Sequence, residues 1–136
     1  MIVVDTNVVA YLLIEGERTA DAQALYARDS DWRSESFLLV EFSNMLATYV
    51  RNGRLDGEAA AGLLASATRT LTGTVNLPHP RALEIALEFG VSAYDARFLA
   101  VARNLGAKLV TEDAKLRRVA PALTQTLAQA QAAARA

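Results

Sequence analysis

Apolar residues along this chain fall into two kinds of pattern. Short runs of consecutive apolar residues, such as residues 2–4 (IVV), are typical of strands that are buried on both faces of a sheet. Longer segments place apolar residues every three or four positions, as amphipathic helices do. In the clearest of these, residues 37–51, the apolar side includes Leu38, Phe42 and Leu46. The chain therefore alternates between buried strands and amphipathic helices.

The limits of these elements follow from the same pattern together with the helix-ending residues. Strands are expected at residues 2–4, 34–36, 73–77 and 107–111. Helices are expected at residues 6–13, 18–28, 37–51, 56–71, 81–89, 93–105 and 113–119. Gly90 and Gly106 directly follow two of these helices, where glycine commonly ends a helix.

The sequence after Pro121 fits more than one structure. Residues 123–127 alternate as in a final edge strand, and a helix that continues into residues 128–136 fits nearly as well. About ten residues at the end, rich in Ala and Gln, are expected to form a helical or a disordered tail.

Strands that alternate with helices predict an α/β fold with a central parallel sheet covered on both faces. No linker, repeat or composition change divides the chain, so residues 1–136 are expected to form one domain. Ligands of such sheets bind at the carboxyl ends of the strands. Asp5 and residues 111–113 lie at these ends of two expected strands, which makes them candidates for a binding site.

Composition excludes several classes of site and leaves others open. The chain has no cysteine, which excludes disulfides and thiolate metal sites, and no apolar run approaches the roughly 18 residues of a membrane span. The start, MIVVDTN, lacks the basic region of a signal peptide, so a cytoplasmic protein without a membrane partner is expected. The net charge of −1 does not indicate a bulk nucleic-acid binder. However, 12 of the 14 basic residues are Arg, which suits local phosphate contacts.

Four acidic residues stand at positions that favour chemistry, although each also has an ordinary structural explanation. Asp5 and Asp113 follow expected strands and could simply begin the next helix as N-caps. Glu41 lies at the edge of an apolar helix face, where a solvated carboxylate is common. Asp95 heads the apolar side of its helix, where it could also form a capping box with Ser92.

Taken together, these acids (Asp5, Glu41, Asp95 and Asp113, called the four carboxylates below) predict a cation site. A cluster of carboxylates repels itself unless some members are protonated or a cation is bound. Mg²⁺ and Mn²⁺ take oxygen ligands, and the one histidine, His79, lies between two prolines far from the acids in the sequence, which argues against zinc. Oxygen-bound Mg²⁺ beside a phosphate supports phosphodiester hydrolysis.

The four carboxylates also lie in four blocks of sequence that resemble the PIN-domain family, specifically the VapC-type toxins of bacterial toxin–antitoxin pairs. The resemblance covers the chain from Met1 to about Val119. The blocks are Val4-Asp5-Thr6-Asn7, the segment from Leu39 to Leu46 around Glu41, Ser92-Ala93-Tyr94-Asp95-Ala96, and Leu109-Val110-Thr111-Glu112-Asp113.

The resemblance implies a three-layer α/β/α sandwich in which the four carboxylates hold Mg²⁺ or Mn²⁺. It implies that Thr6, Asn7 and Thr111 hydrogen-bond the carboxylates or metal-bound water, although local turn and cap bonding explains them about equally well. It further implies an endoribonuclease toxin that cuts tRNA or ribosomal RNA, forms a homodimer and is held inactive by a cognate antitoxin protein.

Two other functions are compatible with parts of the pattern. A phosphatase with Asp5 as nucleophile typically needs a second Asp two residues later, and Asn7 stands there instead. A PIN-like domain that binds RNA or protein without cutting would be expected to have lost some of the four carboxylates, and all four are present. An activity assay distinguishes the three functions. A nuclease cleaves RNA, a phosphatase hydrolyses only phosphate monoesters, and a non-catalytic domain hydrolyses neither.

Overall fold

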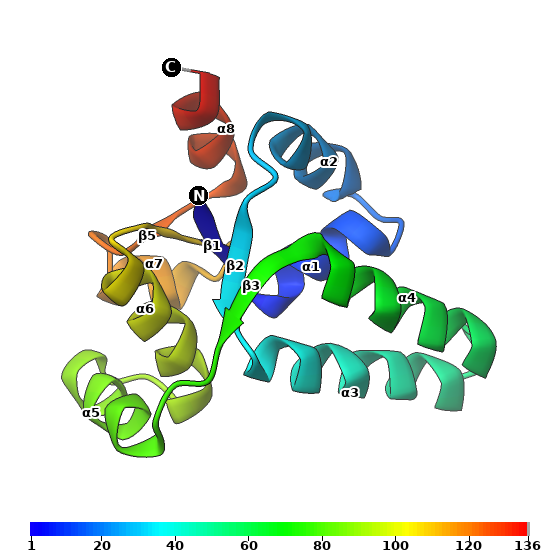
Figure 1. Cartoon of the computed structure of the whole chain (residues 1–136), viewed down its shortest axis with the longest axis horizontal. Coiled ribbons are helices and arrows are strands. Elements are labelled where there is room, and N and C mark those ends of the chain that lie inside the picture. Colours follow the sequence, from blue (N-terminus) through cyan, green and yellow to red (C-terminus); the bar gives the residue numbers. More distant parts are fainter. Residues whose placement is uncertain (136) are drawn as a thin grey trace.

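The structure is a computed structural model that describes residues 1–135. Its centre is a five-stranded sheet in the order β3-β2-β1-β4-β5, in which every neighbouring pair is parallel (Figure 1). The strands are β1 (Ile2–Val4), β2 (Trp32–Glu35), β3 (Leu71–Val75), β4 (Leu109–Val110) and β5 (Thr124–Gln125). The α/β class and the parallel sheet expected from the sequence are confirmed.

Strand β1 occupies the middle of the sheet because its side chains are apolar on both faces. All three of its residues are buried. Val3 pairs with Arg33 of β2 on one side and with Leu109 of β4 on the other. The first residue after this strand, Asp5, therefore lies at the carboxyl edge of the sheet between two flanking strands.

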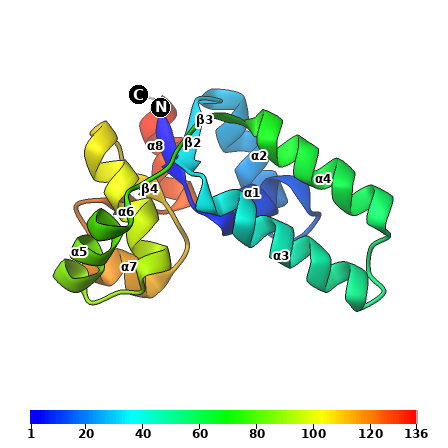
Figure 2. The ribbon, with the colours of Figure 1, turned by 60° about the horizontal axis from the view of Figure 1, so that its bottom comes forward.

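The helices form a layer on each side of the sheet (Figure 2). The first layer contains α1 (Thr6–Leu13), α2 (Thr19–Arg28), α3 (Phe37–Arg51) and α4 (Gly57–Thr70). The second contains α5 (His79–Phe89), α6 (Ala93–Leu105) and α7 (Ala114–Val119). The chain crosses from one layer to the other between β3 and β4, which is what right-handed connections require when the strand order reverses. This confirms the expected α/β/α sandwich.

Side-chain caps begin several of these helices. Asp5, Asp56, Ser92 and Asp113 each accept a hydrogen bond from a backbone N–H in the first turn of the helix that follows. The cap explanations given for Asp5, Asp113 and Ser92 from the sequence are therefore correct. They do not compete with a role in a binding site, because a capping side chain can still face a cleft.

Three strands have limits that differ from the expectation. The strand expected at residues 34–36 is β2, which begins at the buried Trp32. The apolar pattern is interrupted at Arg33, a charged residue whose side chain pairs with Asp31 at the surface. The strand expected at residues 73–77 is β3, which begins at Leu71 directly after α4, with no loop between helix and strand. The strand expected at residues 107–111 is β4, which is limited to Leu109–Val110.

The end of the chain forms both of the alternatives expected for it. Residues 124–125 are a short edge strand, and α8 (Leu127–Arg135) follows it. Disorder is wrong for residues 127–135, because Leu127 and Ala130 are buried and α8 packs against α2. Ala136 lies outside the described residues. In residues 1–135, no helix has both the length and the apolar character needed to span a membrane.

Candidate active site

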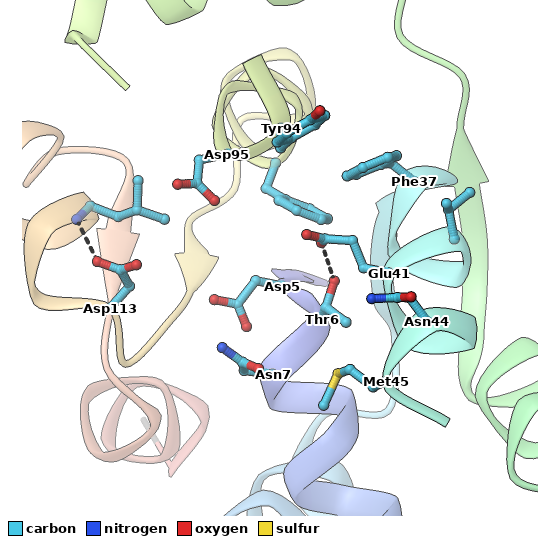
Figure 3. A pocket seen from close by; sticks show the side chains of 13 residues that line it. Asp5, Thr6, Asn7, Phe37, Glu41, Asn44, Met45, Tyr94, Asp95 and Asp113 are labelled. Carbon is cyan, nitrogen blue, oxygen red and sulfur yellow. Dashed lines mark hydrogen bonds between the residues drawn. The ribbon is translucent and has the colours of Figure 1, made fainter. Parts of the chain in front are cut away.

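A cleft of about 570 Å³ opens at the carboxyl edge of the sheet, between the two helix layers (Figure 3). It is the place where the strand order reverses, since β1 leads into the first layer and β4 leads into the second. The four carboxylates all line it, although they come from different parts of the chain. The residues that line it are Asp5, Thr6, Asn7, Phe37, Val40, Glu41, Asn44, Met45, Tyr94, Asp95, Phe98, Asp113 and Leu116.

Asp5 lies at the base of the cleft. Its side chain is buried, and its Oδ1 accepts a 3.0 Å hydrogen bond from the N–H of Val8 at the start of α1. The pKa of Asp5 is raised from the ordinary 3.8 to about 6. Burial is the main cause and the negative charges of Asp95 and Asp113 add to it, while the side chain of Thr111 and the N–H of Val8 oppose the shift. Asp5 is thus a buried carboxylate whose ionised form is disfavoured.

Glu41 reaches the cleft from the second turn of α3. Its Oε1 accepts a 2.6 Å hydrogen bond from the hydroxyl of Thr6, which joins α3 to the first residue of α1. Burial raises the pKa of Glu41, and the charge of Asp95 adds to this, while the Thr6 hydrogen bond lowers it. Glu41 is therefore not the freely solvated boundary residue that its sequence position also allowed.

Asp95 faces the cleft from the first turn of α6 (Figure 3). Its backbone N–H donates to Ser92 Oγ at 3.0 Å, so Ser92 is the N-cap. Burial raises the pKa of Asp95, and Asp113 raises it further, while the Ser92 hydrogen bond and the charge of Lys115 lower it. Its carboxylate is left facing the other acids.

Asp113 is the most exposed of the four carboxylates. Its Oδ1 accepts hydrogen bonds from the N–H groups of Lys115 at 2.9 Å and Leu116 at 3.1 Å, which begin α7. Its neighbour Glu112 points away, as expected for adjacent residues. Glu112 pairs with Arg18 at 3.1 Å and accepts from the N–H of Leu127 at 3.0 Å.

The three residues expected to support the carboxylates behave differently from one another. Thr6 donates to Glu41, and Thr111 accepts from the N–H of Asp113 at 3.1 Å. Thr111 is fully buried, and its side chain also lowers the pKa of Asp5. Asn7 is exposed and lines the cleft, but no hydrogen bond of its side chain is found in residues 1–135.

The donor chemistry of the cleft fits a divalent cation, although the ligands do not converge on one point. Within residues 1–135, no three acidic or histidine side chains are placed closely enough to hold a metal ion. All the acidic donors are oxygen atoms, which Mg²⁺ and Mn²⁺ prefer. Burial is the main cause of the raised pKa values of three of these acids, and repulsion from a neighbouring acid adds to each shift. The assignment of the four carboxylates as catalytic and metal-binding residues stays a prediction.

His79 lies outside this cleft, in a second hollow of about 570 Å³ beside it. Its Nδ1 is 2.7 Å from Nη2 of Arg97, whose Nη1 lies 3.4 Å from the buried carboxylate of Glu35 and 3.0 Å from the carbonyl oxygen of Leu77. This buried ion pair was not predicted from the sequence. Glu35 stands at the end of a short strand, and nothing local in the sequence indicates its partner.

Three other residues that line the cleft were also missed. Asn44 follows Glu41 by three residues, so helical spacing places it on the same face of α3, and this signal was available in the sequence. Phe37 and Tyr94 stack at the side of the cleft, with ring centroids 5.2 Å apart and ring planes inclined by 7°. Their meeting depends on the packing of α3 near α6, which local pattern does not predict.

The fold agrees with comparisons to known proteins. A family model described as the PIN domain matches residues 2–121. The chain belongs to the PIN domain family. This PIN domain is 28% identical over 126 residues to Ribonuclease VapC3 of Pyrobaculum aerophilum, an alignment that covers 90% of the chain and 96% of that protein. It is 32% identical over 110 residues to Exonuclease VapC9 of the same organism, covering 74% of the chain and 83% of that protein. The resemblance to VapC-type proteins is confirmed.

A solved structure also has the same fold. The crystal structure of PAE2754 from Pyrobaculum aerophilum matches this PIN domain with a TM-score of 0.79 at 22% sequence identity, over 98% of the chain and 93% of that protein. At this identity the match supports the arrangement of strands and helices. The function rests on the cleft and on the family.

Proposed function

We propose that this PIN domain is a Mg²⁺- or Mn²⁺-dependent endoribonuclease, the toxin of a toxin–antitoxin pair, which hydrolyses phosphodiester bonds of RNA. The observation that carries the proposal is the gathering of the four carboxylates in one cleft at the carboxyl edge of the sheet, where three of them have raised pKa values. A polyanion such as RNA would be repelled by this cleft unless a cation neutralised the acids. The relatives named as a ribonuclease and an exonuclease support the same class of reaction.

The four carboxylates are the residues that would hold the cation. When bound, a divalent ion polarises the phosphoryl oxygen, lowers the pKa of bound water and stabilises the leaving oxygen. The protein's own contribution is to fix the donors before substrate arrives. Thr6 holds Glu41, and the first turns of α1 and α7 fix Asp5 and Asp113, which cap them.

The proposed substrates are tRNA or ribosomal RNA, cut within the strand. The resemblance to VapC-type toxins supports this choice, while the exonuclease name of one relative supports attack from an end. A circular RNA distinguishes the two, because a circle has no end and is opened by an endonuclease alone.

The test combines this substrate with a matched pair of variants. Purified protein should open circular RNA in Mg²⁺ or Mn²⁺, and EDTA should abolish the activity. Ca²⁺ should not restore it, because Ca²⁺ prefers longer and more numerous oxygen contacts. Asp95→Asn should lose cleavage by a factor of at least about 100 while remaining folded, because it removes charge from the cleft without changing side-chain shape.

The control is Asp56→Asn, which makes the same chemical change at an exposed helix cap outside the cleft. It should cleave at the wild-type rate. Full activity in EDTA, or near wild-type cleavage by Asp95→Asn, would refute the assignment. Hydrolysis of phosphate monoesters with no action on RNA would favour an aspartyl-nucleophile phosphatase at Asp5. Binding of RNA without any hydrolysis would favour a non-catalytic domain.

We further propose three features of the biological setting: a cytoplasmic location, a homodimer, and a cognate antitoxin that blocks the cleft. The VapC names of the relatives support the antitoxin. An unneutralised acidic cleft is also a natural target for an Arg or Lys supplied by another chain. Light scattering on the purified protein tests the dimer. Co-expression with the product of the adjacent reading frame tests the antitoxin, which should co-purify and suppress cleavage.

A further inference from the structure

The stacked rings of Phe37 and Tyr94 form the boundary between the acidic cleft and the second hollow. Both rings and Val40 line the two cavities, so the cavities adjoin at these side chains. Phe37 comes from the first residue of α3 and Tyr94 from the start of α6, and Figure 3 shows their rings on the same side of the cleft as Glu41. Tyr94 is 61% exposed, which is unusual for an aromatic ring that packs against another ring.

Most of the surface that lines the second hollow is apolar, and its charges are balanced. Arg97 is its cationic residue, and the buried Glu35 balances that charge through an ion pair. Ser36, Asn76 and His79 also line the hollow, and their side chains already have partners in the protein: Ser36 hydrogen-bonds Asn76 and Glu35, and His79 hydrogen-bonds Arg97. Such a cavity suits an uncharged planar group. It does not suit a phosphate, which would need an unpaired cation.

We propose that the Phe37–Tyr94 stack is a platform for a nucleobase of single-stranded RNA, and that the second hollow receives this base when a flanking phosphate lies in the acidic cleft. The base extends the stack on the exposed ring of Tyr94, because every nucleobase has a planar π-face that stacks on aromatic side chains. The apolar lining of the hollow then packs against the base. The inference rests on the proposed nuclease function and adds to it a requirement for an unpaired base beside the cut.

The volume and position of the hollow are consistent with this occupant. Its volume of about 570 Å³ falls within the roughly 300–1,000 Å³ of ordinary ligand pockets. A base held there anchors the strand through a contact that carries no charge. This offsets part of the repulsion between the phosphates and the four carboxylates.

The test measures binding separately from cleavage. A fluorescent single-stranded RNA that the wild type cleaves is titrated in Ca²⁺, where hydrolysis is not expected, together with versions that carry one abasic site moved along the strand. Tyr94→Ala should weaken binding of the intact RNA about 5- to 100-fold, as expected for the loss of one base–aromatic stack. Tyr94→Phe keeps the ring and should bind within about twofold of the wild type.

The abasic series identifies the base. In the wild type, one abasic position should weaken binding by a factor similar to that of Tyr94→Ala, and in Tyr94→Ala this position should have no further effect. Leu87→Ala removes another exposed apolar side chain, on α5, and serves as the control that should bind like the wild type.

The outcomes separate the two proposals. If the wild type cleaves RNA and Tyr94→Ala binds intact and abasic strands as the wild type does, the platform is refuted and the nuclease is not. If the wild type neither binds nor cleaves RNA, the proposed function fails and the platform fails with it. Equal weakening at every abasic position, or loss of antitoxin binding with RNA binding intact, would also overturn the platform.

Discussion

Replacing Asp5 by Asn should change the pH dependence of folding stability in a defined direction. Asp5 is buried, and its pKa is raised from 3.8 to about 6 in the folded protein. The folded state therefore binds more protons than the unfolded state between these two values, so stability falls as the pH rises through this window. The change in pKa corresponds to about 3 kcal/mol against the ionised form. The amide of the Asp5→Asn variant has no charge to bury and keeps a side-chain oxygen for the N–H of Val8.

The quantity to measure is the free energy of unfolding of wild type and Asp5→Asn by urea denaturation in EDTA, at several pH values. The variant's stability relative to wild type should be about 3 kcal/mol greater at about pH 8 than at about pH 4, which is on the order of 10 °C in Tm. Any effect of the amide on the free energy of unfolding that does not depend on pH cancels when the two pH values are compared. Asp56→Asn, which makes the same chemical change at an exposed cap outside the cleft, is measured beside it as the control.

A flat difference between the two pH values would refute the argument that burial leaves Asp5 electrostatically unbalanced. If Asp5→Asn instead became less stable relative to the wild type as the pH rose, the fold would stabilise the ionised carboxylate, which is the opposite of the expectation. Adding Mg²⁺ should stabilise the wild type at about pH 8 and have much less effect on Asp5→Asn, if the cation binds this carboxylate.

Two further substitutions test the contacts around the cleft. Thr6→Val removes the hydrogen bond to Glu41 and should lower the free energy of unfolding by about 1–2 kcal/mol. Thr6→Ser keeps the hydroxyl and should lower it by less, so equal stability of the two variants would contradict this prediction. Arg97→Met leaves Glu35 buried without its partner and should destabilise by about 3 kcal/mol in thermal or urea unfolding, well beyond the effect of Arg103→Met in an exposed ion pair; similar losses would show that burial of the pair has little effect.

The sequence predicted those parts of the site that depend on one local pattern. Asp5 and Asp113 directly follow buried apolar runs, so their place at the carboxyl edge of the sheet could be inferred. Glu41 and Asp95 were found from the face of a helix on which each lies. The pairing of Glu35 with Arg97 joins residues 62 positions apart, and no local period carries that information.

The contrast between local pattern and long-range contacts also explains the errors in the predicted fold. The start of β2 was missed because its inner residue, Trp32, is followed by a charged one. The tail after Pro121 was left open because β5 has two residues, too few for a period of two to be told from a helical turn. The strand and the helix are distinguished only by tertiary contacts, because β5 pairs with β4 and α8 packs against α2.

The use of carboxylates as helix caps affects which mutations the gene can tolerate. Asn caps a helix about as well as Asp does, so Asp5→Asn and Asp113→Asn should leave the starts of α1 and α7 intact. An Asp codon becomes an Asn codon by one base change. If the protein is a toxin in which Asp5 and Asp113 are catalytic, as proposed, folded but inactive forms lie one nucleotide away at each of these positions. Cells that escape its toxicity should therefore repeatedly carry full-length, well-folded protein with Asn at these positions, and they would keep a surface that still occupies the antitoxin.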